Sequence, residues 1–329
     1  MTDTRVNPGA VAKLFAYQED EVAHVQNSSF IYSLMKEGVD TYFGGFEGKI
    51  VLDLGAGFSL PQGCLPMALA VRDGARQCFG IDISHPEHFA TDPLKVEFWR
   101  TAREVLGVSV QGLEQNRVFF GGADTMHDDS VVSRIVPLQM SASDMWFRDG
   151  MFDVIFSNAV FEHVKDAKNV LLETFRVLKP GGGLYAHWNP YTSFQMGGHD
   201  IGIPFMYPWA HLRLDRAAHV EKLRQMLNDR ELLRTANPPE HQITEGRALT
   251  YKDTPELLFK HMDDDLNKLR VKDFLRYASE AGFEIVHSGF HINDTQRQYL
   301  TSEIQAELSD YSEDELLTIF HSAALRKPC

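Results

Sequence analysis

The amino-acid sequence predicts an α/β fold centred on a mostly parallel β-sheet, and two neighbouring features carry this prediction. Residues 50–54, Ile-Val-Leu-Asp-Leu, form an apolar run that is typical of a strand buried on both faces of a parallel sheet. Gly55-Ala56-Gly57 follows at once, and glycine permits a tight turn and the close approach of a ligand to the backbone. Because ligands bind at the carboxyl ends of strands in open α/β sheets, Asp53 and this turn are candidates for a binding site.

The bulk properties fit a globular chain and disfavour two classes of partner. The 329 residues are 43% hydrophobic, which is enough for a sizeable core in one large domain or two smaller ones. The formal net charge of -14 opposes nucleic acid or an anionic membrane as the main partner. The three cysteines form no disulfide framework, the N-terminus is unlike a secretory signal, and no stretch approaches the ~20 apolar residues of a membrane span. We therefore expect a cytoplasmic protein.

The elements in the first half of the chain follow from periodicity and from helix-capping residues. Apolar residues at helical spacing predict two helices within residues 1–48. A short helix is expected at 65–71, with Pro66 tolerated in its first turn, and a strand at 78–82. Asp92-Pro93 is a helix start by cap and first-turn proline. Residues 108–134 are irregular and charged, and they yield no assignment.

The second half continues the alternation of strands and helices. We predict strands at 135–140, 152–158, 184–188, 283–286 and 317–325, and helices at 167–178, 217–233, 255–269 and 271–281. The Lys179–Gly183 stretch should end the first of these helices, and Gly282 should cap the last. Residues 312–316 are expected to form an acidic turn.

The residues around the glycine turn bear on the class of cofactor. A dinucleotide site needs a third small residue in the turn, but Leu60 and Pro61 occupy that part of the sequence, so a nicotinamide cofactor is disfavoured. S-adenosylmethionine (SAM) has no phosphate and carries a positive amine and a sulfonium, which suit an acidic residue at the end of a strand. Asp82 ends the second strand at the spacing of a carboxylate that binds ribose hydroxyls; a helix-capping aspartate is the alternative.

Two longer motifs resemble one enzyme family. Val51–Gly57, Val-Leu-Asp-Leu-Gly-Ala-Gly, resembles the first motif of class I SAM-dependent methyltransferases. Residues 152–183, which contain FDVIFSN, FEHV and RVLKPGGG, resemble the pattern of the small-molecule members. The resemblance covers about residues 51–190 and implies a Rossmann-like, doubly wound, mostly parallel sheet of seven strands. Ser59 departs from it at a position where the family often has a third glycine, and the Pro61–Pro66 stretch lengthens the loop.

The resemblance also implies a division of the chain. Residues 1–48 would be an N-terminal helical lid (a simple packing extension is the alternative), 49–190 the SAM-binding core, 191–265 a substrate cap inserted after the fifth strand, and 266–329 the completion of the sheet. The family position that binds the adenine amino group falls on Asp144, with Met145 as an apolar wall; an exposed loop aspartate is the alternative. The expected cofactor-binding residues are Asp53, Gly55, Ala56, Gly57, Asp82, Ile83, Ser143, Asp144, Met145, Asn158 and Ala159.

Methyl transfer requires alignment of a nucleophile, and an oxygen or nitrogen nucleophile also needs its proton removed, often by histidine or aspartate. We expect the base among His187, His199 and His211, at the end of the fifth strand and in the cap, with Asp200 as a carboxylate alternative. These four residues could instead ligate a metal, but their spacing matches no tight metal motif, so none is expected.

The prediction is therefore a methyltransferase that uses SAM, yields S-adenosylhomocysteine and methylates an oxygen or nitrogen of a small molecule such as a natural product or a sugar-type metabolite. Two alternatives stay open: methylation of a peptide or protein side chain, and a SAM-binding sensor or assembly subunit without catalysis. The sequence leaves the oligomeric state unknown.

Overall fold

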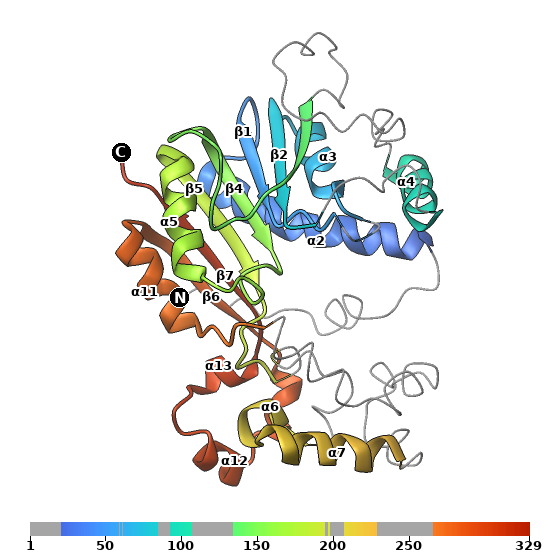
Figure 1. Ribbon diagram of the computed structural model, residues 1–329, viewed down its shortest axis with the longest axis vertical. Helices are drawn as coiled ribbons and strands as arrows, with labels where there is room; N and C mark the ends of the chain where they lie inside the picture. Colours follow the sequence, from blue (N-terminus) through green and yellow to red (C-terminus); the bar gives the residue numbers. More distant parts are fainter. Residues whose placement is uncertain are drawn as a thin grey trace.

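A seven-stranded sheet forms the centre of the molecule (Figure 1). The computed structural model describes residues 21–58, 60, 62–84, 93–106, 134–194, 197, 207–228 and 266–329. The strands are β1 (Ile50–Leu54), β2 (Gln77–Asp82), β3 (Ile135–Gln139), β4 (Phe152–Asn158), β5 (Leu178–Trp188), β6 (Glu284–Ile292) and β7 (Thr318–Arg326).

The strand order is β3-β2-β1-β4-β5-β7-β6. Neighbours are parallel from β3 to β5, while β7 runs antiparallel to both β5 and β6. The predicted seven-stranded, mostly parallel sheet is thus confirmed. Because β1, β2, β4 and β5 are parallel, their carboxyl ends meet at one edge, and the register there places Asn158 beside His187.

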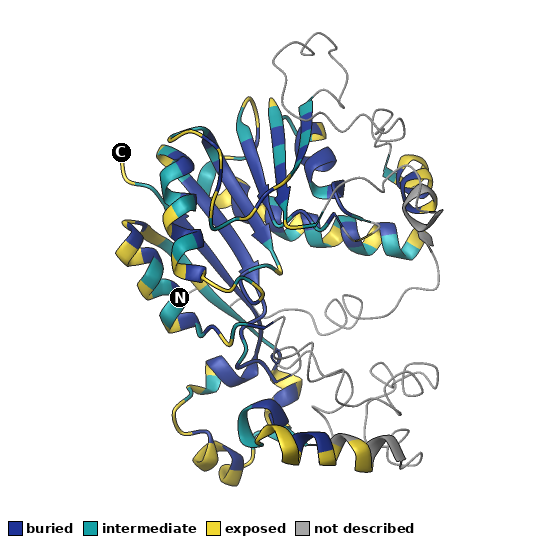
Figure 2. Ribbon diagram, viewed as in Figure 1, coloured by how far each residue is buried: buried dark blue, intermediate teal, exposed yellow. Residues whose placement is uncertain are grey.

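Helices cover both faces of the sheet, which explains why its strands are buried (Figure 2). On one face, α2 (Glu21–Phe43), α3 (Leu65–Arg72) and α4 (Pro93–Leu106) share a core with Val51 and Phe156. On the other, α5 (Ala167–Val177) and α11 (Val271–Ala281) share a core with Leu52 and Ile155. Alternate residues of one strand therefore serve two cores, which is why the strands are apolar along their length.

Helix α2 is built into the first of these cores. A Cβ atom on Gly38 would lie 2.1 Å from the ring of Tyr185 on β5, so the helix approaches the sheet as closely as a glycine allows. The Tyr32 hydroxyl donates a hydrogen bond of 2.9 Å to Asp73 at the end of α3. Residues 21–43 are thus a packed layer, in line with the alternative of a packing extension for this part of the expected lid (residues 1–48); residues 1–20 lie outside the described part.

A second group of helices lies beyond the carboxyl edge of the sheet (Figure 1). It contains α6 (Ala210–Arg213), α7 (Arg216–Asn228), the 3₁₀ helix η5 (Asp294–Tyr299), α12 (Ser302–Glu307) and α13 (Glu313–Leu317). Phe194 and Trp209, from the segment after β5, pack there against Ile304, Leu308 and Leu316. The proposed cap after β5 therefore shares a core with the connection between β6 and β7, which the sequence did not lead us to expect.

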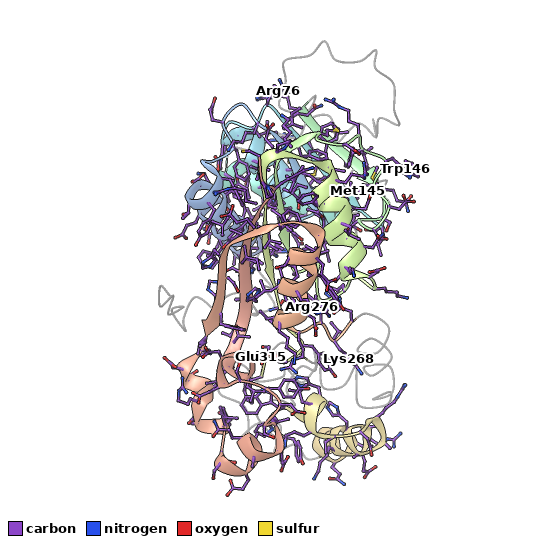
Figure 3. All side chains as sticks on the ribbon, turned by 90° about the vertical axis from the view of Figure 1, so that its left-hand side faces the viewer. Arg76, Met145, Trp146, Lys268, Arg276 and Glu315 are labelled. Atoms are coloured by element: carbon purple, nitrogen blue, oxygen red, sulfur yellow. The ribbon has the colours of Figure 1, made fainter. Side chains whose placement is uncertain are left out.

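An ion pair ties this second group of helices to α11. Arg270, at the start of α11, lies 3.0 Å from the carboxylate of Glu315 on α13, and both side chains are largely buried. Figure 3 shows Glu315 in the lower part of the molecule. Ser312 and Glu315 form a capping box, so the residues predicted to be an acidic turn are instead the start of a helix.

Three other boundaries differ from the predictions. Strand β5 begins at Leu178, six residues earlier than expected, because Leu178 pairs with Phe152 of β4 before the glycines interrupt the register. Strand β6 extends to Ile292 because β7 pairs with it along its full length. Residues 266–269 are not helical, and Lys268 adopts a φ of 57°; the rest of the helix predicted at 255–269 lies outside the described residues.

Among the described residues, no helix has both the length and the apolar character that crossing a membrane requires.

Candidate functional site

The glycine turn after β1 is fastened to the end of β2. The backbone N–H groups of Gly55 and Ala56 both donate to the carbonyl of Ile81 at 2.9 Å. Gly55 has a φ of 84°, and a Cβ atom on it would lie 2.1 Å from a methyl group of Val160. Only glycine fits this position, both in conformation and in space. The turn is therefore a rigid floor at the carboxyl edge of the sheet.

Asp82 joins the ends of β1 and β2. Its Oδ2 accepts a hydrogen bond of 2.8 Å from the N–H of Gly57, and its Oδ1 accepts from the N–H of Ser84 at 2.8 Å and from the Ser84 hydroxyl. These bonds fix the carboxylate beside the glycine turn and use three of its four acceptor sites, so one site on Oδ2 is left for a ribose hydroxyl, and a second hydroxyl can replace the Ser84 hydroxyl at Oδ1. The next residue, Ile83, is 79% exposed at this edge. Ser84 was not among the residues that the sequence singled out.

Asp53 lies one residue before the end of β1 and is only 4% exposed. Its Oδ2 atom has no hydrogen-bond partner among the described residues. Burial, and then the nearby carboxylate of Asp82, raise the pKa of Asp53 to about 8. A buried carboxyl oxygen without a partner is unusual, and a cationic group of a ligand would satisfy it.

The loop after β3 is held by α5. Asn169 donates from its side-chain amide to the carbonyl of Ser143 at 2.5 Å, and the N–H of Met145 donates to Glu173 at 2.9 Å. Met145 is buried in the core, and its assignment as an apolar wall of the adenine site stays a prediction. Asp144 is exposed, and Trp146, 80% exposed, lies at the surface (Figure 3). The assignment of Ser143 and Asp144 to the adenine site stays a prediction as well.

The ends of β4 and β5 bring three of the predicted residues together. The Nδ1 atom of His187 lies 2.9 Å from Oδ1 of Asn158, and the N–H of Ala159 donates to the carbonyl of His187 at 2.8 Å. Since an amide oxygen only accepts hydrogen bonds, Nδ1 carries the proton and Nε2 keeps its lone pair. Ala159 has a φ of 52°, which is uncommon for a residue with a side chain and is often found at functional sites.

His187 is surrounded by aromatic rings and by a second histidine. Its ring lies 4.5 Å from that of Phe320 and 5.8 Å from that of His291. Burial, followed by His291 and then His321, lowers the pKa of His187 to about 3. The imidazole is therefore neutral at physiological pH, with the lone pair at Nε2 unprotonated.

Ser322 connects two more histidines on the same face of the sheet. Its hydroxyl lies 2.8 Å from Nε2 of His291 and 3.3 Å from Nε2 of His287. The hydroxyl can donate to at most one of these rings, so at least one of the two imidazoles carries a proton at Nε2 and donates it to Ser322. Burial lowers the pKa of His291 to about 4. The sequence did not reveal this group, because it depends on the pairing of β6 with β7.

The depressed pKa of His291 leads to a testable pH dependence. A histidine of the unfolded chain titrates near 6.5, so the unfolded state binds more protons than the folded state between about pH 6.5 and 4. The contribution of the neutral His291 to the free energy of unfolding is therefore fully present above about pH 6.5 and is lost as the pH falls toward 4. Asp53 and Glu162, with pKa values raised to about 8, act in the opposite direction, so the total stability is a poor readout.

The readout that isolates His291 is a difference between two proteins. We expect the difference in unfolding free energy between wild type and His291→Gln to be about 2 kcal/mol larger at pH 7.5 than at pH 5, as measured by urea denaturation. Above pH 7.5 the difference should be constant, which is an internal control. A difference that does not vary between pH 5 and 7.5 would show that His291 is as easily protonated in the folded protein as in the unfolded chain.

The structure gives His211 different surroundings from His187. Its Nε2 donates to the carbonyl of Tyr191 at 2.8 Å, and the Tyr191 hydroxyl donates to the carbonyl of His211 at 3.1 Å. This reciprocal pair fastens the segment after β5 to α6, which suits a role in positioning the cap. His199 and Asp200 lie outside the described residues, so the structure does not test them.

Glu162, in the loop after β4, is a further buried carboxyl group that the sequence analysis did not select. Its Oε1 accepts a hydrogen bond of 3.3 Å from the N–H of Asn189, while Oε2 has no partner in the described part of the chain. Burial raises the pKa of Glu162 to about 8. Across the described ranges, no group of three or more histidine, cysteine or acidic side chains is arranged to hold a metal ion.

Comparison with known proteins gives matches to methyltransferases over part of the chain. Residues 108–186 match the family described as a methyltransferase domain. Arsenite methyltransferase from Aquipseudomonas alcaligenes is 30% identical over 139 residues, which are 42% of this chain and 32% of that protein. The ubiquinone/menaquinone biosynthesis C-methyltransferase UbiE of Vibrio campbellii is 38% identical over 63 residues, which are 19% of this chain and 24% of that protein. The matched segments thus span about a third or less of these curated relatives.

A solved structure, geranyl diphosphate C-methyltransferase from Streptomyces coelicolor A3(2), aligns over 98% of this chain and 89% of that chain, with a TM-score of 0.46 and 14% sequence identity.

Proposed function

We propose that the chain is a class I methyltransferase that transfers a methyl group from SAM to an oxygen or nitrogen of a small molecule; the match of residues 108–186 to a methyltransferase domain and the seven-stranded sheet support this. The observation that carries this proposal is the edge formed by Asp53, the glycine turn and Asp82. Two carboxylates flank one rigid turn there, and neither has a basic partner in the contacts of the described residues.

This edge fits SAM better than a dinucleotide. The partnerless Oδ2 of Asp53 suits a cationic group, and the fixed carboxylate of Asp82 suits the ribose hydroxyls. A pyrophosphate at the same turn would face the carboxylate of Asp82, which is electrostatically unfavourable, and it would not supply a positive charge to Asp53. The base of this site would be the turn of Gly55, Ala56 and Gly57, with Ile83 beside it. The adenine end would be formed by Ser143 and Asp144.

When bound, SAM supplies an electrophilic methyl group on a positively charged sulfur. The residues of the chain then have two tasks: to hold the acceptor in line with that methyl group and to take the acceptor's proton. Asn158 fixes the tautomer of His187, so that the lone pair at Nε2 can accept the proton as the new bond to the methyl carbon forms. With a pKa of about 3 the ring is a weak base, so it takes the proton only in concert with the formation of the new bond and then passes it to solvent or buffer.

The acceptor class is inferred from the cap. The segment after β5 is rich in aromatic residues. Together with the connection between β6 and β7 it forms a separate hydrophobic cluster beyond the carboxyl edge of the sheet. This arrangement favours a small acceptor enclosed between the sheet and the cap. The matched relatives carry names of enzymes that methylate arsenite or a carbon atom, so the oxygen or nitrogen acceptor rests on the neutral His187 rather than on similarity. The composition agrees with a cytoplasmic location.

The test is methyl transfer from labelled SAM to a panel of hydroxylated and aminated small molecules, with a peptide library as a second panel. We expect labelled product with members of the first panel, together with S-adenosylhomocysteine in equal amount. Product in the peptide panel alone would favour the side-chain methyltransferase. Cofactor binding without product in either panel would favour the non-catalytic sensor.

A further inference from the structure

Asp53 is the most deeply buried of the acidic residues at the proposed cofactor edge. It is paired in the sheet with Gly80 on β2 and with Phe156 on β4, so its surroundings are backbone and apolar side chains. Its side chain is 4% exposed, and Oδ2 has no hydrogen-bond partner in the described residues. A carboxylate in such a place would be costly without a counter-charge.

The titratable groups that face Asp53 do not supply that counter-charge. Asp82 on β2 is acidic and disfavours a second negative charge nearby. The buried thiol of Cys78, also on β2, interacts with Asp53, and Cys64 at the start of α3 lies close to Cys78. Both thiols are neutral or negative, so none of these neighbours stabilises an ionised Asp53.

We propose that Asp53 is neutral in the empty protein and that it gives up its proton to solvent when a cofactor places a cationic group beside it at this edge. This inference rests on the proposed function, because it takes the cofactor to be SAM or S-adenosylhomocysteine. The positive charge of the ligand takes the place of the proton, so the site stays electrically balanced in both states. The O–H bond of Asp53 breaks, its electrons stay on the carboxylate, and the proton passes to the buffer.

Linkage gives the sign of the effect on affinity. The free protein binds one proton more than the complex, so affinity for the cofactor rises with pH until Asp53 is ionised in the free protein as well. With a pKa of about 8, this rise should cover the range below pH 8, at about tenfold in affinity for each pH unit. Acidification should therefore weaken cofactor binding.

The experiment is calorimetric titration of the full chain with S-adenosylhomocysteine and with SAM between pH 6 and 7, below the pKa of about 7.7–8.0 of an α-amino group, so that the ligand keeps most of its own proton. Each titration is run in phosphate and in imidazole, whose heats of ionisation differ. At pH 7 we expect about 0.9 proton released for each cofactor bound, as follows from a pKa of about 8. Release with both ligands would identify their shared amino group as the counter-charge, and release with SAM alone would identify the sulfonium.

Two variants control the experiment. Asp53→Asn should bind with no buffer-dependent heat and with an affinity that is constant over this pH range. Glu162→Gln removes a carboxyl group whose pKa is equally raised but which lies in the loop after β4, and it should leave the proton release as in wild type. Binding without proton release in wild type would overturn the inference and leave the proposed function standing. Absence of any binding by a folded protein would overturn the proposed function itself.

Discussion

Replacement of Asp82 by alanine is expected to weaken S-adenosylhomocysteine binding by about 10²-fold. The carboxylate of Asp82 is held beside the glycine turn by the N–H groups of Gly57 and Ser84, so one free site on Oδ2 can accept from a ribose hydroxyl, and the second ribose hydroxyl can replace that of Ser84 at Oδ1. A hydrogen bond to a charged group contributes about 1.5–3 kcal/mol, and about 3 kcal/mol for the pair corresponds to the stated loss. The measurement is the dissociation constant by calorimetry.

Two other variants make this prediction specific. Ser84→Ala removes only the hydroxyl that supports Oδ1 of Asp82, and we expect a loss of less than about tenfold. Asp149→Ala removes an exposed acidic side chain whose partner is Arg176, away from the proposed site, and it should leave affinity unchanged. If Asp82→Ala binds as tightly as wild type, Asp82 does not contact the ribose.

Replacement of His187 by glutamine is expected to lower turnover by about 10²-fold or more, with nearly constant cofactor affinity. A general base contributes about 10²–10⁴-fold in rate, and the lone pair at Nε2 is the feature that glutamine cannot reproduce. Because the pKa of His187 is about 3, its titration should not affect the wild-type rate near pH 6.5. The pH profiles of wild type and variant should therefore have the same shape in this range. This differs from the behaviour of an exposed histidine base, which would titrate near neutral pH.

Asn158→Leu is the companion variant, since it leaves the imidazole in place but removes the oxygen that fixes its tautomer. We expect an intermediate loss of turnover. His211→Gln should instead lower thermal stability, because it breaks the reciprocal pair with Tyr191. If His187→Gln retains wild-type turnover while His199→Gln or Asp200→Asn loses it, the base lies in the cap and our assignment fails.

The strands were the most predictable part of the fold. Strand β4 and helix α11 match their predicted bounds, because buried apolar runs and the capping glycine at 282 are signals within the element itself. The predicted start of β5 was too late because the glycines after Lys179 are typical of the end of a helix. Pairing with β4 instead extends the strand through these glycines. The helices between β6 and β7 were missed because their core depends on residues far along the chain, such as Phe194 and Trp209.

The candidate site likewise contains residues that the sequence predicts and contacts that it does not. The glycine turn, Asp53 and Asp82 follow from motifs in which spacing along the chain predicts proximity, and the structure places them at one edge. The partners of His187 could not be predicted, because Phe320 and His291 reach it only through the pairing of β5, β7 and β6. The neutral state of His187 likewise depends on burial, which a sequence does not specify.

The most direct test of the central claim is a crystal structure of the full chain soaked with S-adenosylhomocysteine. We predict density for the ribose within hydrogen-bond distance of Asp82, and for the amino-acid end of the ligand over the Gly55–Gly57 turn, with a cationic nitrogen or the sulfur facing Asp53. The sulfur should lie between this turn and the ends of β4 and β5, within reach of a small acceptor held against His187. An ordered ligand elsewhere, or ordered NAD at this edge in crystals that exclude S-adenosylhomocysteine, would contradict the account.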